Sequence, residues 1–293
     1  MSVKSRGFTL VELIMVIALA GVVAVMISTL LSGPMESFTA QSRRAALVDL
    51  GAGALQRMAR DVRLAVPNSL RVSADGQAFE LLLIHSAGRH RPNRNDSEGL
   101  RFGEAPANCG STTADGSCDS VQVLTPSLEL SGARWMVLYN VGAQSGAAPV
   151  AGANVWAGAN PGVITPTGTT FALRNGAPAG ESLIALDNLP AGGFRFAFAS
   201  PQRRLYLAER VVGYRCQNGQ LVRYSYDQLL ASLPSTPPPG SAPQLLASDV
   251  SRCQFSYRAG TAQRSSLLRL SLGMTQAGET LQLIKQVHVD NAP

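Results

Sequence analysis

The chain has 293 residues, of which 45% are hydrophobic and only 15% are charged, and its formal net charge at pH 7 is +6. The hydrophobic share is enough for a packed core, and the low charge favours a membrane-attached or secreted protein over a cytosolic enzyme. Two basic residues, Lys4 and Arg6, precede a long apolar segment, so the rest of the chain is only mildly basic. This balance gives no argument for nucleic acid as a partner.

The N-terminal apolar segment has no charged residue from Leu13 to Leu31, yet the acid Glu12 lies just inside its start. A helix over 8–31 would be roughly 36 Å long at about 1.5 Å per residue, which spans a bilayer core of about 30 Å. The basic residues before it predict a cytoplasmic N-terminus with the remainder outside. An ionised acid at mid-membrane costs roughly 2.5–3.5 kcal/mol, so Glu12 needs an explanation.

An ordinary secretory signal peptide is one alternative for this segment. The tripeptide Ala18 to Ala20 fits the small-residue cleavage pattern, but apolar residues continue to Leu31, beyond the point where such a core should end. Glu12 also fits poorly inside a signal-peptide core. A simple membrane anchor, with the acid solvated at the membrane edge, is the second alternative.

The stretch RGFTLVELI, Arg6 to Ile14, resembles the leader region of type IV prepilins and of the pseudopilins of type II secretion. In that family a prepilin peptidase cuts after the glycine, here Gly7, and N-methylates the new first residue, here Phe8. The resemblance implies that residues 1–7 are a leader peptide and that Glu12 pairs with the α-ammonium of Phe8 on a neighbouring subunit. A carboxylate among apolar helices needs such an opposite charge.

A second helical segment follows the apolar one. The tripeptide Ser32-Gly33-Pro34 predicts a break or kink, because proline removes a backbone donor and clashes with the preceding turn. Helical periodicity then resumes up to Pro67, with an apolar stripe at Leu47, Leu50, Ala54, Met58, Val62 and Ala65. We therefore expect one N-terminal helix over 8–66, transmembrane at 8–31, whose second half packs against a head domain over 67–293.

The head is predicted to consist of strands and turns, so the expected fold class is α+β with a predominantly antiparallel β head. The expected strands are Ala78 to His85, Ser120 to Thr125, Arg134 to Val141, Thr169 to Arg174, Glu181 to Asp187 and Gly193 to Ser200. In the last strand Phe194, Phe196 and Phe198 alternate with other residues, which is typical of a half-buried strand. Asn218-Gly219 and the run from Thr275 to Gly278 predict hairpin turns.

Four cysteines lie in two local sets, Cys109 with Cys118 and Cys216 with Cys253. An even number behind an export segment favours two disulfides in an oxidising compartment. The alternative is four reduced, buried thiols. None of the three histidines stands at zinc-finger spacing from a cysteine, so the sequence predicts no metal site.

Sequence motifs for catalysis are absent, since the chain has no P-loop, H-E-x-x-H or G-x-S-x-G. We therefore expect neither catalytic residues nor a cofactor. One basic stretch, Gly88 to Asp96, holds Arg89, Arg91 and Arg94, which could contact DNA, lipid headgroups or an acidic sister subunit. No aromatic residue is interleaved for stacking on single strands, which argues against nucleic acid. A solvated loop is the alternative.

The stretch from Ser42 to Val72 resembles minor pilins of the mannose-sensitive haemagglutinin (MSHA) pilus group, and GYRC and SRCQFSY near the end look similar. This resemblance implies a structural subunit that initiates or caps a type IV pilus. Its partners would be other minor pilins, the major pilin, the prepilin peptidase, the inner-membrane assembly platform and the lipid bilayer. It would start in the inner membrane and move into the pilus, from periplasm to cell surface.

Three other functions fit parts of the same pattern. A J-type minor pseudopilin of type II secretion shares the leader and a two-part β head. A tip adhesin or DNA-binding module would use the helix as a tether, with the basic stretch Gly88 to Asp96 as its contact surface. An anchored periplasmic enzyme would use the helix only to hold it at the membrane.

Overall fold

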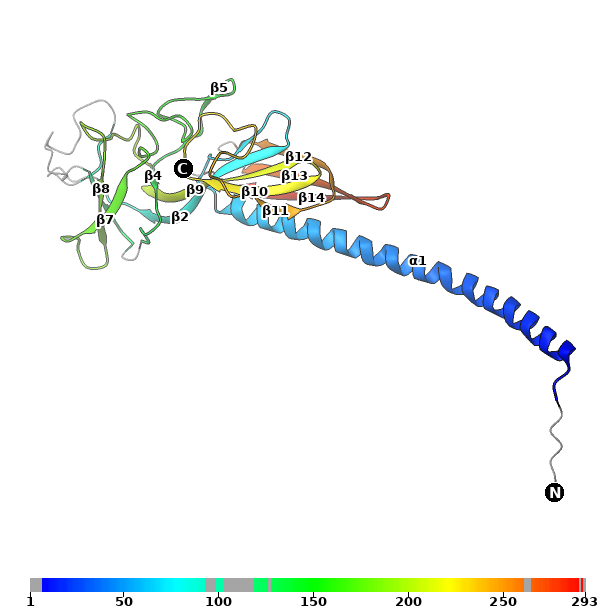
Figure 1. Cartoon of the computed structure of the whole chain (residues 1–293). Coiled ribbons are helices and arrows are strands. Elements are labelled where there is room, and N and C mark those ends of the chain that lie inside the picture. The colour runs from blue at the N-terminus through cyan, green and yellow to red at the C-terminus, as the bar shows by residue number, and fades with distance from the viewer. Residues whose placement is uncertain are drawn as a thin grey trace.

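The computed structural model of the chain describes residues 7–92, 99–102, 119–125, 128–260, 265–289 and 291, with the backbone alone at 31–34. One long helix, α1 (Leu10–Arg63), leads into a head built from antiparallel strands. The helix extends far beyond the head, and the N-terminus lies at its distant end (Figure 1). The fold is therefore α+β, as the sequence predicts.

Helix α1 is continuous, so of the break or kink expected at Pro34 the break does not occur. The backbone is helical through positions 31–34, and α1 bends gently along its length without ending (Figure 1). A proline removes a single backbone donor, and a long helix can absorb this loss by bending. The 54 residues of α1 correspond to a length of about 80 Å.

The second half of α1 packs on the head with one face. The buried residues are Leu47, Ala54, Leu55, Met58, Ala59, Val62 and, just past the helix end, Ala65. Most of the predicted apolar stripe is therefore buried. Leu50 is the exception, with 37% of its surface exposed, because the contact face lies on the side of the helix that carries Leu55 and Ala59.

The largest sheet has six strands in the order β1-β2-β9-β10-β11, with β4 also paired to β9. The bounds are β1 Arg71–Val72, β2 Ala78–Arg89, β4 Trp135–Val137, β9 Arg204–Gln217, β10 Gln220–Tyr226 and β11 Gln244–Ala247. The expected hairpin between β9 and β10 is confirmed. Its turn residues Asn218 and Gly219 both have positive φ angles, 51° and 72°, as a type I′ turn requires.

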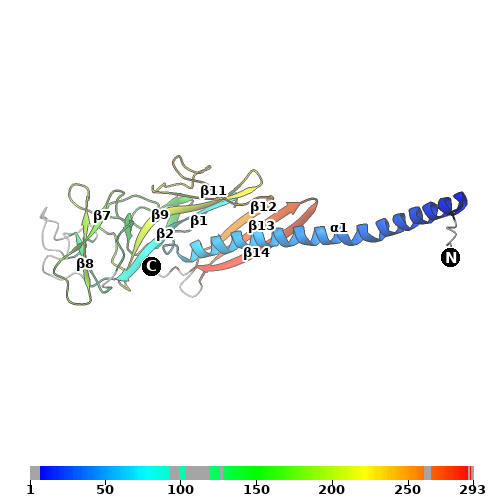
Figure 2. The ribbon, with the colours of Figure 1, turned by 60° about the horizontal axis from the view of Figure 1, so that its bottom comes forward.

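A second sheet of three strands lies beside α1, in the order β12 (Val250–Arg258), β13 (Ser266–Gln276) and β14 (Glu279–Val289). Helix α1 contacts β13 and β14, and both views show it running along this sheet (Figures 1 and 2). The hairpin predicted near Thr275 to Gly278 is confirmed, with Gln276 opposite Glu279. This sheet supplies the surface on which the second half of α1 packs.

The end of the head away from the N-terminus of α1 holds a third sheet, ordered β3 (Ser120–Val123), β8 (Ser182–Asp187) and β7 (Thr170–Arg174). A small hairpin pairs β5 (Gln144–Ser145) with β6 (Ala148–Pro149).

Five of the six strands expected at the start of the head are found. The strand expected up to Val141 ends early at Val137, where Tyr139 adopts a positive φ of 47° that interrupts the extended backbone.

The strand expected over Gly193 to Ser200 is wrong. Phe194 and Phe196 are buried in the distal core, but this segment forms only isolated bridges, in which Phe196 pairs with Gly162 and Phe102. Phe198 is 51% exposed and its ring lies 6.3 Å from that of Tyr139. The alternating phenylalanines therefore indicate the burial of two side chains, but this segment forms no ladder of backbone hydrogen bonds.

Candidate functional site

The start of α1 forms a capping box made by Thr9 and Glu12. The Thr9 hydroxyl accepts from the Glu12 backbone N–H at 3.3 Å, and Glu12 Oε2 accepts from the Thr9 backbone N–H at 3.2 Å. The Thr9 hydroxyl also donates to Glu12 Oε2 at 3.1 Å. These bonds satisfy donors that a helix N-terminus leaves unpaired, which contributes about 1 kcal/mol to the helix start.

Glu12 therefore has a local partner within its own chain. Sequence reasoning considered only a neighbouring ammonium or solvent, and it missed this pair although Thr9-x-x-Glu12 is the capping-box pattern. The carboxylate is nevertheless at the surface of the isolated chain. It thus remains accessible to a second partner.

The two residues before the cap, Gly7 and Phe8, are exposed and lie outside the helix. Phe8 has 81% of its surface exposed, and no atom lies within 4 Å of the position a Cβ would take at Gly7. Gly7 and Phe8 thus lie outside the packed part of the chain that the structure describes.

The first half of α1 is apolar on all sides and buries nothing in the isolated chain. None of the residues in its most apolar stretch is buried, and α1 is long and apolar enough to cross a membrane. The described side chains from Leu10 to Leu30 are all exposed. A helix that is apolar all round is stable where lipid or other apolar helices surround it.

The second half of α1 is bound to the head by a buried ion pair as well as by apolar packing. Asp61, whose side chain is 6% exposed, accepts from Tyr214 Oη at 2.6 Å and from Arg223 Nε at 2.8 Å. Tyr214 is on β9 and Arg223 on β10, so one carboxylate joins the helix to two strands. Burial, and then the hydrogen bond to Asp61, raise the pKa of Tyr214 above its ordinary value of 10.0.

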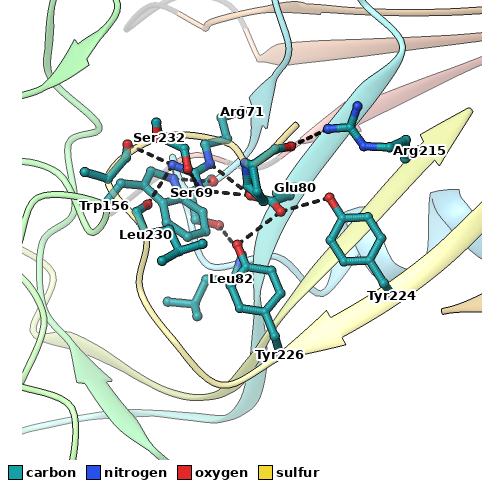
Figure 3. A network of polar contacts seen from close by, with 12 residues as sticks. Ser69, Arg71, Glu80, Leu82, Trp156, Arg215, Tyr224, Tyr226, Leu230 and Ser232 are labelled. Carbon is teal, nitrogen blue, oxygen red and sulfur yellow. Dashed lines mark hydrogen bonds and ion pairs between the residues drawn. The ribbon is translucent and has the colours of Figure 1, made fainter. Parts of the chain in front are cut away.

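A second buried carboxylate, Glu80 on β2, organises the centre of the head (Figure 3). Its Oε2 accepts from Arg71 Nη2 at 2.8 Å, and its Oε1 accepts from Tyr224 Oη at 2.9 Å and from Tyr226 Oη at 3.1 Å. Glu80 lies opposite Gly213 of β9, which lies opposite Tyr224 of β10. A Cβ at Gly213 would be 2.3 Å from the Tyr224 ring, so glycine there lets that ring cross β9 toward Glu80.

Arg71 extends this cluster to the loop after β10. Its guanidinium donates to the carbonyls of Leu230 and Ala231 at 2.9 and 3.0 Å, and its Cζ lies 3.8 Å from the ring centroid of Trp156 (Figure 3). Trp156 in turn donates to the Ser69 carbonyl at 2.9 Å. Because Glu80 is fully buried and accepts from three side chains, we assign the cluster a structural role.

Sequence reasoning missed both buried carboxylates. Glu80 stands alone within the apolar run AFELLLIH, and Asp61 stands beside the buried stripe of α1. A charged residue inside such a run signals a buried partner. The partners themselves are more than 140 residues away along the chain, except for Arg71, so one sequence does not reveal them.

The basic stretch is only partly a loop. Arg89 belongs to β2, and His90 is buried, with its Nδ1 at 2.7 Å from the Arg91 carbonyl. Arg91 binds the carboxylate of Glu181 through two of its nitrogens, with Nε at 2.8 Å from Oε2, and this bond lowers the pKa of Glu181. Arg94 lies outside the described residues.

The cysteines and tryptophans have structural positions. Cys216 of β9 and Cys253 of β12 form a disulfide that links the largest sheet to the sheet beside α1. Cys109 and Cys118 lie outside the described residues. Trp135 and Trp156 are both buried in the core. Within the described residues, no group of three or more histidine, cysteine or acidic side chains is placed to hold a metal ion.

Residues 3–28 match the family model described as the prokaryotic N-terminal methylation motif. This range contains Gly7, Phe8 and Glu12, and the match supports a type IV pilin-like prepilin, that is, a pilin- or pseudopilin-type subunit. Such a motif implies interaction with other pilins and with the prepilin peptidase, and it suggests a structural subunit rather than an enzyme. Together with the apolar helix, it fits membrane anchoring and pilus assembly. No curated protein and no solved structure matches the chain.

Proposed function

We propose that this chain is a minor pilin, most like MshO of the MSHA pilus, which initiates assembly of a type IV pilus or caps it. Prepilin peptidase cuts it after Gly7 and methylates the new N-terminus at Phe8. Until assembly the protein spans the inner membrane once, with 8–31 in the bilayer and the head in the periplasm. The observation that carries this proposal is the exposed Gly7-Phe8 segment directly before an apolar, unpacked half of a continuous helix.

Glu12 has two successive roles in this proposal. In the isolated chain its carboxylate caps α1 through Thr9. During assembly the Glu12 carboxylate moves from water to a position among apolar helices. There it pairs with the α-ammonium of Phe8 on the neighbouring subunit. Removal of one partner from a buried pair costs about 3–5 kcal/mol, so the pairing strongly favours the correct axial register.

The test separates the pairing role of Glu12 from its capping role. Glu12→Ala removes both roles, whereas Thr9→Ala weakens only the cap and leaves the carboxylate available. We expect Glu12→Ala to abolish incorporation into sheared pilus fractions and Thr9→Ala to be incorporated at nearly the native level, with equal amounts of both variants in the membrane. Normal incorporation of Glu12→Ala would contradict the pairing. An equal defect in both variants would mean that Glu12 acts only as a helix cap.

A J-type minor pseudopilin of type II secretion is the second candidate. The division of the head into a sheet beside α1 and a distal sheet agrees with the two-part head of that class. Copurification distinguishes the two functions, because a minor pilin is recovered with pilus components and a pseudopilin with the secretion machine. The tip-adhesin and DNA-binding alternatives have less support, since Arg91 of the basic stretch is already paired with Glu181.

A further inference from the structure

The sheet β12-β13-β14 has two chemically different faces. The residues that face α1 are apolar, and Leu268, Leu270, Leu272 and Met274 of β13 are all buried in the core they share with the helix. The alternating residues point to the opposite face, which is polar. It presents Arg252, Gln254 and Ser256 on β12, Arg269, Ser271 and Gly273 on β13, and Gln282, Ile284 and Gln286 on β14.

Small residues in the middle strand create a hollow on this outer face. Ser271 lies between Gln254 and Ile284, and Gly273 lies between Arg252 and Gln282. The hollow has a volume of about 180 Å³ and is lined by Arg252, Gln254, Ser256, Arg269, Ser271 and Gln282. A Cβ at Gly273 would be 3.1 Å from the Arg252 Cβ, so glycine lets the arginine lie close to the floor of the hollow.

The two arginines of the hollow have no counter-charge within the part of the chain that the structure describes. Arg71, Arg91 and Arg223 each bind a carboxylate, but neither Arg252 nor Arg269 forms an ion pair with a described residue. No acidic side chain lines the hollow. Two guanidinium groups, two amides and two hydroxyls therefore surround one concave site. The Gln282 amide donates to Ser271 Oγ at 3.2 Å, and the two guanidinium groups supply the donors for a ligand.

We propose that this hollow binds an oxyanion, a carboxylate or sulfate, carried by an acidic polysaccharide. Arginine is suited to such groups because its planar donors bind two oxygens at once. Gln254 and Gln282 in the lining, with Gln286 beside them, can bond the hydroxyls of the attached sugars. The charge and the amides of this face thus complement an acidic glycan chain.

The same face is less suited to a protein or a nucleic acid. Protein interfaces have an aromatic or apolar centre, whereas the lining of the hollow contains no apolar side chain and Ile284 lies beside it, 51% exposed. Single-stranded nucleic acid needs stacking aromatic side chains, and the lining contains none. Binding to duplex DNA draws most of its affinity from several phosphate contacts, and two arginines provide few of them.

Binding of the full chain in non-ionic detergent micelles to heparin and to polygalacturonate tests this assignment. At constant, near-physiological salt, we expect the double variant Arg252→Gln, Arg269→Gln to bind at least about tenfold more weakly. Ser271→Leu keeps every charge but fills the hollow, so we expect a similar loss. Arg60→Gln, which removes one exposed charge from α1, is the matched control and should bind like the native chain.

Three outcomes would overturn the assignment. Native-like binding by the double variant would show that the arginines are not the site. Native-like binding by Ser271→Leu would show that the polysaccharide is held by general charge attraction and does not use the hollow. A short DNA duplex bound as tightly as heparin, and lost in the same variants, would contradict the choice of a polysaccharide. Unfolding followed by tryptophan fluorescence shows whether each variant is folded, and pilus assembly does not enter the assay, so failure here leaves the proposed function untouched.

Discussion

The two halves of α1 have opposite relations to the rest of the chain, although they belong to one unbroken helix. From Leu10 to Leu30 the described side chains are exposed and almost wholly apolar. From Leu47 to Val62 one face is buried against the head and Asp61 is bonded to two strands. The first half thus lacks a folded partner, while the second half is part of the core.

This difference shows where the chain keeps its capacity to assemble. An apolar surface of this size is not stable in water, so under the proposed function lipid covers it before assembly and other helices cover it afterwards. The second half is fixed to the head through buried contacts. We therefore expect substitutions in the two halves to affect different measurements, namely assembly for the first half and head stability for the second.

The largest effect on head stability is expected from Asp61→Ala. The change leaves the Arg223 guanidinium and the Tyr214 hydroxyl without their shared acceptor, at a cost of about 3–5 kcal/mol. Trp135 and Trp156 are both in the head, so urea unfolding in micelles can be followed by their fluorescence. Asp49→Ala, an exposed acid on the same helix, should change the free energy of unfolding by less than about 0.5 kcal/mol.

Removal of the Cys216–Cys253 disulfide comes next. It joins the two sheets near α1 across a sequence separation of 37 residues. In the chain-entropy model, closure of such a loop stabilises the fold by roughly 3–4 kcal/mol. The double variant Cys216→Ser, Cys253→Ser should lower the urea midpoint accordingly. An unchanged midpoint would show that removal of the disulfide does not increase the conformational entropy of the unfolded chain.

Matched methionine substitutions compare the two halves directly. Met58 is fully buried in the second half, and Met15 in the first half is 58% exposed. Met58→Ala should destabilise the head by about 2–5 kcal/mol through lost burial and a cavity, whereas Met15→Ala should leave head unfolding unchanged. Equal effects on the unfolding free energy would mean that the two halves are not independent.

A smaller effect is expected at alkaline pH. The pKa values of Tyr214, Tyr224 and Tyr226 are raised above 10.0, chiefly because burial disfavours the phenolate. Their contribution to stability is complete below pH 10.0 and is lost as the pH rises from there toward the raised values, because the unfolded tyrosines ionise first. Unfolding from pH 8 to 11 should show this decline, and Tyr214→Phe should make it shallower.

The sequence predicts those parts of the fold that depend on local patterns. The helix periodicity, the Asn218-Gly219 turn and apolar runs such as Ala78 to His85 are local signals, and each corresponds to an observed element. The Thr9–Glu12 cap is local too, and its pattern was present but overlooked. The strand expected around Phe196 failed because alternation reports burial, while a strand also needs a neighbour to pair with.

The features that hold the head together could not be predicted in this way. Glu80 meets Tyr224 and Tyr226, and Asp61 meets Tyr214, only because the chain folds back over long sequence separations. The hollow between Arg252 and Arg269 likewise depends on the register of three strands. Such sites come from strand pairing, and one sequence contains no direct record of that pairing.

The identity of the mature N-terminus tests the central claim most directly. Mass spectrometry of the N-terminal peptide from the membrane-bound protein would measure it, and Gly7→Leu, which places a side chain at the cleavage site, would serve as the unprocessed control. We expect a peptide that begins at N-methylated Phe8 in the native protein and an uncut leader in the variant. A native peptide that begins at Gly21, or one that keeps Met1, would contradict the pilin account and leave an exported or anchored β domain.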